Sequence, residues 1–219
     1  MIIVLEGCMG SGKTSVAREI TSLCGGRIVR PFRDPGQYIH APVDGTVDVS
    51  APDPGGSYAL MGRLGVPTNT WHEDVYVAEM LYQIHQVPCP RGDGHVNILL
   101  DRSLISGLAW NRLDRTAGRP RLSPGAEVEL IGWWSERMTA LDATLCMLRV
   151  APDIAARRCR EAGRFSGPIS DISQEADAIL DVASHVRGVR SMMANTGPHG
   201  MFDARMVARE VIAKAVCQP

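Results

Sequence analysis

The segment 7–14 constrains the fold of this chain more than any other. It reads Gly-Cys-Met-Gly-Ser-Gly-Lys-Thr, which fits the pattern G-x-x-x-x-G-K-[ST], and it lies between the apolar run 2–5 and a helix-like stretch over 15–23. In a loop of this kind the glycines let successive backbone N–H groups converge on an anion, the lysine reaches the outer phosphates and the threonine hydroxyl ligates Mg²⁺. The segment therefore predicts a strand, a phosphate-binding loop and a helix, in that order.

Length and composition agree with one α/β domain that spans residues 1–219. The 219 residues are 45% hydrophobic and 21% charged, which is ordinary for a soluble globular domain with a sizeable core. A formal net charge of −1 offers no strong overall field to attract nucleic acid or an anionic membrane. We therefore expect the partner to be a small molecule.

The cysteines and the N-terminal residues indicate a reducing compartment. The six cysteines show no C-x-x-C spacing and mostly lie in apolar stretches, which is typical of free thiols rather than of disulfides or a zinc site. Only the short apolar run 2–5 separates Met1 from Glu6, no basic segment comes before it, and no apolar run approaches the length of a membrane span. We expect a cytoplasmic protein without a membrane segment.

Hydrophobic periodicity predicts that strands and helices alternate along the chain. The predicted strands are 2–6, 27–32, 96–100, 143–150 and 199–203, and the predicted helices are 13–23, 71–86, 104–112, 125–139, 152–161, 171–194 and 204–216. The segment 33–69 is dense in Pro and Gly and is predicted to be a loop with a short helix near 58–64. This alternation is typical of a parallel sheet with helices on both faces.

Three polar segments are predicted to meet at one edge of that sheet, because ligands of such sheets bind beyond the carboxyl ends of the strands. They are the loop 7–13 and the pairs Arg33-Asp34 and Asp101-Arg102. Phosphoryl transfer needs a phosphate cradle, Mg²⁺, cations and a carboxylate that orients or deprotonates the acceptor hydroxyl. Asp101 or Asp34 could serve the hydroxyl, while Arg33 and Arg102 could hold an anionic acceptor.

A group of arginines follows the predicted strand 143–150. Its members are Arg157, Arg158, Arg160 and Arg164, on a helix and the Gly-containing segment after it. Arginines on a segment able to close over the site would exclude water and brace the transferred group. Each feature also has a structural alternative: a helix cap for Asp101, a Pro-Gly turn for 33–36 and a solvated helix face for the arginines.

At these residues the sequence resembles the thymidylate kinase family and the related deoxynucleoside kinases. The resemblance follows the chain in order, through the loop at 7–14, Arg33-Asp34-Pro35-Gly36 where thymidylate kinases have an R-E-P-G turn, Asp101-Arg102-Ser103 at their D-R-[YHS] strand end, and the arginine-rich segment after 149–152. It implies an α/β P-loop kinase fold with five parallel strands, helices on both faces and an arginine-rich lid at about 157–170. It also implies ATP and Mg²⁺ as cofactors.

The residues and the resemblance together give a set of expected site residues. The expected catalytic residues are Lys13, Asp34, Asp101, Arg102 and Arg160. The expected ATP-binding residues are Gly7, Gly10, Ser11, Gly12, Lys13, Thr14, Ser15, Arg157 and Arg164. The resemblance implies that the acceptor contacts Arg33, Tyr76, Gln83 and Arg102, with Tyr76 stacked on its base. Mg²⁺ is expected on Thr14 and Asp101.

Two departures from the family bear on the acceptor. Met9 stands where thymidylate kinases usually have an acidic residue, and Met80 lies near the position of their base-reading arginine. We therefore expect a nucleoside monophosphate acceptor, with a pyrimidine or a modified pyrimidine as its base. The alternatives are a deoxynucleoside kinase and a kinase of a 5-hydroxymethyl-pyrimidine base, free or in DNA, although the near-neutral charge disfavours DNA. A P-loop ATPase that is not a kinase is a further alternative, and both a monomer and a homodimer agree with the sequence.

Overall fold

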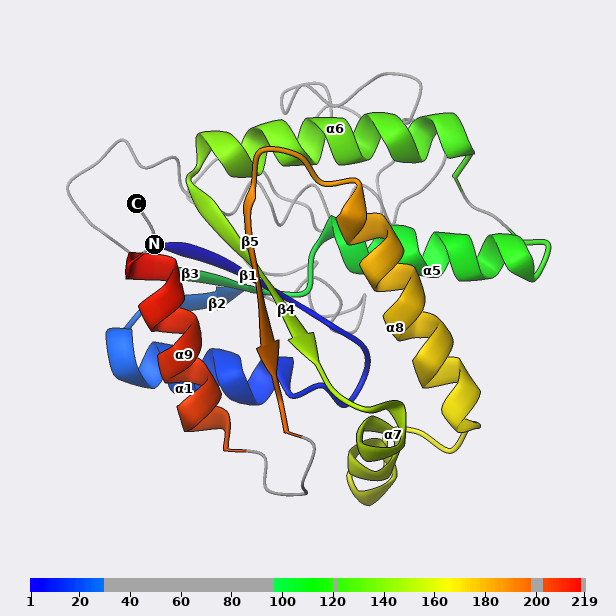
Figure 1. The fold of residues 1–219 in the computed structure, drawn as a ribbon. Helices are drawn as coiled ribbons and strands as arrows, with labels where there is room; N and C mark the ends of the chain where they lie inside the picture. Colours follow the sequence, from blue (N-terminus) through cyan, green and yellow to red (C-terminus); the bar gives the residue numbers. More distant parts are fainter. Residues whose placement is uncertain (30–96, 120–121, 198–202, 218–219) are drawn as a thin grey trace, which may run out of the picture.

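The computed structural model describes residues 1–29, 97–119, 122–197 and 203–217. Within them the chain forms a parallel sheet in the order β2-β3-β1-β4-β5 (Figure 1). Its strands are β1 (Ile2–Glu6), β2 (Arg27–Val29), β3 (Ile98–Asp101), β4 (Ala143–Arg149) and β5 (Arg190–Asn195). Because β1 lies between β3 and β4, the loop that follows β1 emerges at the middle of the sheet edge.

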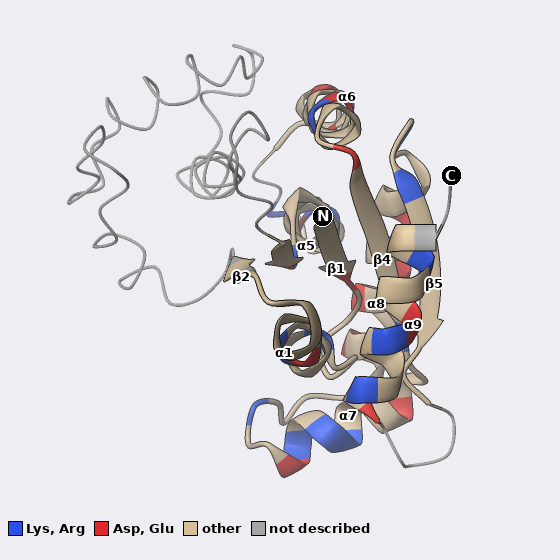
Figure 2. Ribbon diagram, turned by 90° about the vertical axis from the view of Figure 1, so that its left-hand side faces the viewer, with Lys and Arg blue, Asp and Glu red and all other residues tan. Residues whose placement is uncertain are grey.

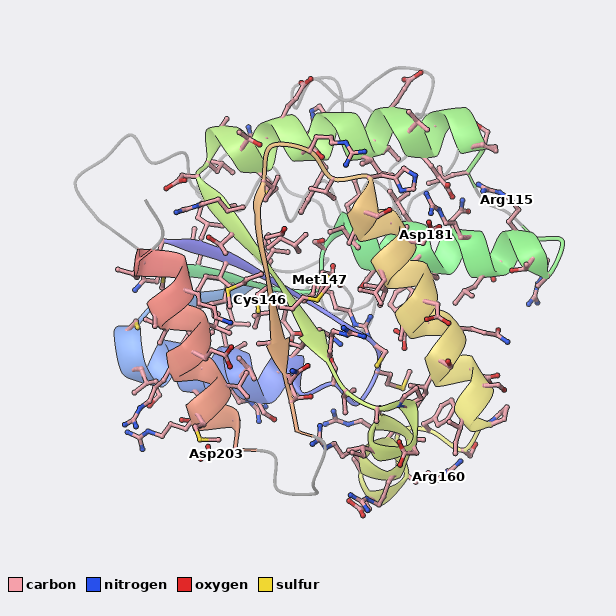
Figure 3. All side chains as sticks on the ribbon, in the orientation of Figure 1. Arg115, Cys146, Met147, Arg160, Asp181 and Asp203 are labelled. Carbon is pink, nitrogen blue, oxygen red and sulfur yellow. The ribbon has the colours of Figure 1, made fainter. Side chains whose placement is uncertain are left out.

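Helices cover both faces of the sheet. One face carries α1 (Lys13–Cys24) and α9 (Ala204–Cys217), and the other carries α5 (Leu104–Thr116), α6 (Pro124–Ala140) and α8 (Ile169–Ser184) (Figure 1). Successive strand residues point to opposite faces. In β4, accordingly, Cys146 belongs to the core under α1 and α9 and Met147 to the core under α5, α6 and α8; both residues are labelled in Figure 3. The remaining helix of the described residues, α7 (Pro152–Glu161), follows β4 beyond the carboxyl end of the sheet.

Helix starts differ in a way that bears on the site. Ser103 caps α5 by accepting from the N–H of Ile105, and Ser123 caps α6 by accepting from the N–H of Ala126. Helix α1 begins after Gly12, at φ 91°, and has no side-chain cap. The first N–H groups of a helix have no partner within the helix and favour a bound anion. The start of α1 is therefore built differently from the starts of α5 and α6.

The predicted α/β class, with a parallel sheet and helices on both faces, is confirmed. The single helix predicted over 171–194 is wrong: α8 ends at Ser184 and β5 occupies Arg190–Asn195. The last strand was expected at 199–203, but β5 is the strand beside β4, and 199–202 lie outside the described residues. The predicted loop at 33–69, the helix at 71–86 and the end of the strand at 27–32 also lie outside them.

Two further expectations concern cysteines and membranes. Among the described cysteines, Cys8, Cys24, Cys146 and Cys159 are free thiols. No helix in the described part of the chain combines the length and the apolar character needed to span a membrane.

Candidate active site

The loop 7–13, which is expected to bind phosphate, packs closely against β4 and α7, and this explains its glycines. The backbone angle φ is 146° at Gly7, 77° at Gly10 and 91° at Gly12, in a region that residues with a side chain rarely adopt. A Cβ atom at Gly7 would lie 2.5 Å from the carbonyl oxygen of Leu148, and one at Gly10 would lie 2.4 Å from that of Ala155. At Gly7 and Gly10, a larger residue is therefore excluded both by the backbone angle and by a clash of its Cβ atom.

Lys13 is folded over its own loop. Its Nζ donates to the carbonyl oxygens of Gly7 at 2.6 Å and Cys8 at 2.8 Å, and to Oγ of Ser11 at 3.2 Å. Burial, reinforced by the charge of Arg102, lowers the pKa of Lys13 to about 8. The ammonium group is thus held by neutral oxygens at the place where the loop is expected to receive phosphate.

Thr14 and Asp101 are hydrogen-bonded to each other and both line the pocket beside the loop. Thr14 lies in the first turn of α1 and Asp101 ends β3, where it pairs with Leu5 of β1. Oγ1 of Thr14 donates to Oδ2 of Asp101 at 2.6 Å. A hydroxyl and a carboxylate oxygen are the hard ligands that Mg²⁺ prefers, and Mg²⁺ sites usually add substrate phosphates and water to one or two carboxylates. The pair therefore fits Mg²⁺, and the described residues hold no cluster of three or more His, Cys, Asp or Glu that could bind a metal.

A pocket of about 660 Å³ opens above the loop. Its size lies within the range of small-molecule sites. Among the described residues its lining includes one carboxylate, Asp101, and the basic side chains of Lys13, Arg18, Arg102, Arg158 and Arg164. The basic residues of α7 are drawn in blue at the lower edge of Figure 2. Such a lining favours a polyanionic ligand.

Arg102 is fixed by several contacts at the edge of this pocket. Its backbone has φ 83°, which for a residue other than glycine costs on the order of 1–3 kcal/mol. Its guanidinium lies 4.9 Å from the centroid of the Trp110 ring, and its Nη1 donates to Oγ of Ser106 at 3.0 Å and to Oε1 of Glu175 at 3.1 Å. These contacts hold the strained residue in one orientation.

The four arginines of the predicted lid separate into two pairs. Arg158 and Arg164 line the pocket. Arg158 donates through Nη2 to the carbonyl oxygen of Thr196 at 2.8 Å and through Nη1 to that of Gly10 at 3.4 Å, and burial lowers its pKa.

Arg157 and Arg160 form the second pair and do not line the pocket. Arg157 is exposed and lies 3.9 Å from the carboxylate of Glu161. Arg160 donates to the carbonyl oxygen of Gly167 at 3.3 Å and is labelled on α7 in Figure 3.

The structure brings together the expected residues of the loop, of the end of β3 and of part of the lid. Gly10, Gly12, Lys13, Thr14, Ser15, Asp101, Arg102 and Arg164 line one pocket. Gly7 and Ser11 lie in the loop beneath it and contact Lys13. The other expected residues, Arg33, Asp34, Tyr76 and Gln83, together with Met80, lie outside the described part of the chain.

Sequence reasoning missed two carboxylates. Glu6, fully buried at the end of β1, accepts from Oγ of Ser103 at 2.7 Å and from Oγ of Ser106 at 2.6 Å, and burial raises its pKa. The signal was an acidic residue at the end of an apolar strand, directly before the loop. Glu175 of α8 accepts from the backbone N–H of Met9 at 2.7 Å across 166 residues of sequence, so no local pattern could have identified it.

No protein-family model and no curated protein matches the sequence. The structure is similar to that of deoxyadenosine kinase from M. mycoides with bound dCTP, at 15% identity and a TM-score of 0.57 over 98% of each chain. It is also similar to the YorR protein from Bacillus subtilis in complex with phosphorylated GDP, at 14% identity and a TM-score of 0.54 over 100% of each chain. These likenesses do not single out thymidylate kinases. The chain shares the fold of these two proteins.

Proposed function

We propose that this chain is an ATP-dependent phosphotransferase whose acceptor is a nucleoside monophosphate. The observation that carries the proposal is the contact of 2.6 Å between the Thr14 hydroxyl and the Asp101 carboxylate, in one pocket with Lys13. A phosphate loop, a hard-oxygen pair and cations around one cavity are the parts that phosphoryl transfer requires. The fold supports the same reaction class.

On the donor side, the loop and the lid bind ATP. The backbone N–H groups at 10–15 cradle the phosphates, and Lys13 leaves the carbonyl oxygens of Gly7 and Cys8 to reach them. Arg158 and Arg164 already lie in the pocket and supply positive charge there. Arg157 and Arg160 would join them only if α7 changed its position, since neither lines the pocket.

Thr14 and Asp101 would hold Mg²⁺. The bound ion would neutralise charge on the phosphate oxygens and orient them. Asp101, next to Arg102 at the end of β3, also lies where a carboxylate could orient the acceptor hydroxyl. Asp34 is the alternative carboxylate for that task.

On the acceptor side, Arg102, Trp110 and Met9 form part of the pocket wall. Arg102 and Arg33 bind the anionic group of the acceptor, and we assign its base to Tyr76 and Gln83. Methionine offers no strong hydrogen bond, so Met9 favours a pocket that selects by shape. We propose a pyrimidine or a 5-substituted pyrimidine as the base.

A second function, deoxynucleoside kinase, is favoured by one observation. The positive charge of Arg102 is already compensated by Glu175, at 3.1 Å. A paired arginine attracts an anionic acceptor less than an unpaired one, so an uncharged nucleoside fits this geometry. The likeness to the fold of deoxyadenosine kinase agrees with it.

The test is an ADP-release assay with ATP and Mg²⁺ over nucleosides, their monophosphates and 5-hydroxymethyl-pyrimidine DNA, with Lys13→Met as the inactive control. We expect acceptor-dependent ADP release with a pyrimidine monophosphate. Release with nucleosides alone would assign the second function. Acceptor-independent ATP hydrolysis, with no phosphorylated acceptor by mass spectrometry, would show a P-loop ATPase instead.

A further inference from the structure

Three pocket-lining residues donate to one carboxylate behind them, that of Glu175. Its Oε2 accepts from the backbone N–H of Met9 at 2.7 Å, and its Oε1 accepts from Nη1 of Arg102 at 3.1 Å and from Nε1 of Trp110 at 3.4 Å. Glu175 itself is only 6% exposed and does not line the pocket in the part of the chain that the structure describes. The Glu175 side chain thereby links α8 to both the loop and α5.

Only a carboxylate satisfies this arrangement. Each of the three partners is a donor, and both oxygens of Glu175 accept. A glutamine would turn its NH₂ group toward either Met9 or Arg102, so that two donors would face each other in a buried site. The side chain must therefore accept on both oxygens at once.

Arg102 makes a second hydrogen bond through the same nitrogen that contacts Glu175. Its Nη1 donates to Oγ of Ser106, and this hydroxyl donates to the buried Glu6. With Glu175 removed, Arg102 would lose its only ion-pair partner within the described residues, and Trp110, whose ring lies under the guanidinium, would lose its contact with the same carboxylate. The orientation of the guanidinium in the pocket thus depends on Glu175.

We propose that Glu175 is a positioning residue, which fixes Met9, Arg102 and Trp110 as one wall of the pocket and so sets the affinity for the acceptor. This inference rests on the proposed phosphotransferase function. The wall adjoins Asp101, whereas the donor phosphates are assigned to the loop N–H groups, Lys13 and Arg158. Loss of Glu175 therefore acts on the acceptor and leaves ATP binding nearly unchanged.

The chain supplies a matched control in Glu127 of α6. Glu127 is 3% exposed and also receives only donors: Nδ2 of Asn111 at 2.6 Å, Nη2 of Arg115 at 2.8 Å and Nε of Arg112 at 3.3 Å. None of these residues lines the pocket. Arg115, labelled in Figure 3, lies near the end of α5 far from α7. Glu127→Gln thus repeats the buried chemistry of Glu175→Gln away from the site.

The first measurement uses the free protein and needs no substrate. In ¹⁵N NMR spectra of the parent and both variants, we expect Glu175→Gln to shift the Met9 amide and the Trp110 indole signals and to speed their hydrogen exchange. Glu127→Gln should leave both signals in place. Unchanged Met9 and Trp110 signals in a folded Glu175→Gln protein would overturn the proposal, whether or not the chain is a kinase.

The second measurement separates the two substrates. With the acceptor that the ADP-release assay identifies, we expect Glu175→Gln to raise the acceptor KM by about tenfold or more and to leave the ATP Kd within about threefold. Glu127→Gln should lower the Tm about as much as Glu175→Gln does, but it should change neither the acceptor KM nor the ATP Kd. Equal losses of ATP and acceptor affinity in Glu175→Gln, or an unchanged acceptor KM, would reduce Glu175 to a structural residue. Absence of transfer by the parent would instead refute the proposed function, and the NMR result would still decide the positioning role.

Discussion

The hydroxyl of Thr14 donates to the carboxylate of Asp101 across 87 residues of sequence, at 2.6 Å. The contact follows from the order of the strands. Since β3 pairs with β1 in parallel, with Asp101 opposite Leu5, both strands end at the same edge of the sheet. The helix that follows β1 then brings Thr14 back to that edge. A hydroxyl and a carboxylate so placed form the expected metal site only in the folded chain.

Lys13→Met should abolish phosphoryl transfer while the fold persists. The substitution removes the only cation that the loop itself carries, and the loss of such a charge-stabilising contact raises the barrier by several kcal/mol. The fold should tolerate it, because Lys13 is buried and costs desolvation. The measurements are kcat and a circular-dichroism melt. Lys214→Met is the control, since Lys214 is the only other lysine and is paired with Glu210 on the exposed side of α9. If the turnover of Lys13→Met stayed within about tenfold of that of the parent, the kinase assignment would be refuted.

Asp101→Asn should lower kcat by about 10²-fold or more, because the amide can neither accept a proton nor bind Mg²⁺ as a carboxylate does. Thr14 can still donate to the amide oxygen, so the Tm should hardly change. Asp142→Asn is the control: Asp142 is an exposed residue before β4 that pairs with Arg190. The helix-cap alternative for Asp101 is wrong, because Ser103 is the residue that caps α5. A normal kcat together with a lowered Tm in Asp101→Asn would therefore make the contact with Thr14 a structural one and move the catalytic role to Asp34.

Local patterns predicted β1, the loop and α1 because each depends on neighbours in sequence. Strand β5 was missed for a physical reason. It lies at the edge of the described sheet, where only Met192 and Ala194 are buried and Met193 is 52% exposed, and both Met and Ala also favour helices. The helical hydrophobic periodicity of α8 therefore continues into the sequence of β5 without a break.

Long-range contacts set the rest of the site and could not be deduced from sequence. Which arginine of α7 faces the pocket depends on how the helix packs, and the buried Ala155, Ala156 and Cys159 turn Arg158 toward the loop and Arg157 toward solvent. Glu175 reaches the loop only because α8 packs against α5 and α7. The loop and the end of β3 were thus predictable from sequence, whereas the role of Glu175 and the choice between the arginines of α7 were not.

Gly10→Ala should destabilise the protein and weaken ATP binding. Gly10 has φ 77°, and a Cβ atom there would meet the Ala155 carbonyl oxygen at 2.4 Å and Sγ of Cys159 at 2.9 Å. Left-handed backbone alone costs about 1–2 kcal/mol for other residues, and the clash adds to it. Gly132→Ala, in the middle of α6 with open space around it, should instead stabilise by about 0.5–1 kcal/mol. Urea unfolding and ATP titration of both variants measure the contrast, and an unchanged ATP Kd in Gly10→Ala would contradict the close approach of α7 to the loop.

Glu6→Gln should stabilise the protein increasingly as the pH rises. Burial raises the pKa of Glu6 above its ordinary value of 4.5, against the opposing hydrogen bonds from Ser106 and Ser103. The stability that this carboxyl contributes is therefore complete below pH 4.5 and is lost as the pH rises through its folded-state pKa. Glutamine is uncharged throughout and can accept from one serine hydroxyl while it donates to the other. The Tm of Glu6→Gln minus that of the parent should grow as the pH rises above 4.5, and a difference that is constant with pH would mean that Glu6 is not held in a site that disfavours its charge.

Arg158→Gln should raise the KM for ATP and lower kcat, each by about tenfold, whereas Arg157→Gln should change neither by more than about twofold. The two residues are adjacent on α7, but Arg158 lines the pocket and bonds to the carbonyl oxygens of Gly10 and Thr196, whereas Arg157 faces solvent beside Glu161. Because both variants remove one positive charge from the same helix, a general electrostatic effect would appear in both. Steady-state kinetics at two ionic strengths provide the measurement. A larger effect of Arg157→Gln would show that α7 turns in the ATP complex and that the arginine facing the phosphates there is not the one that lines the pocket in the ligand-free protein.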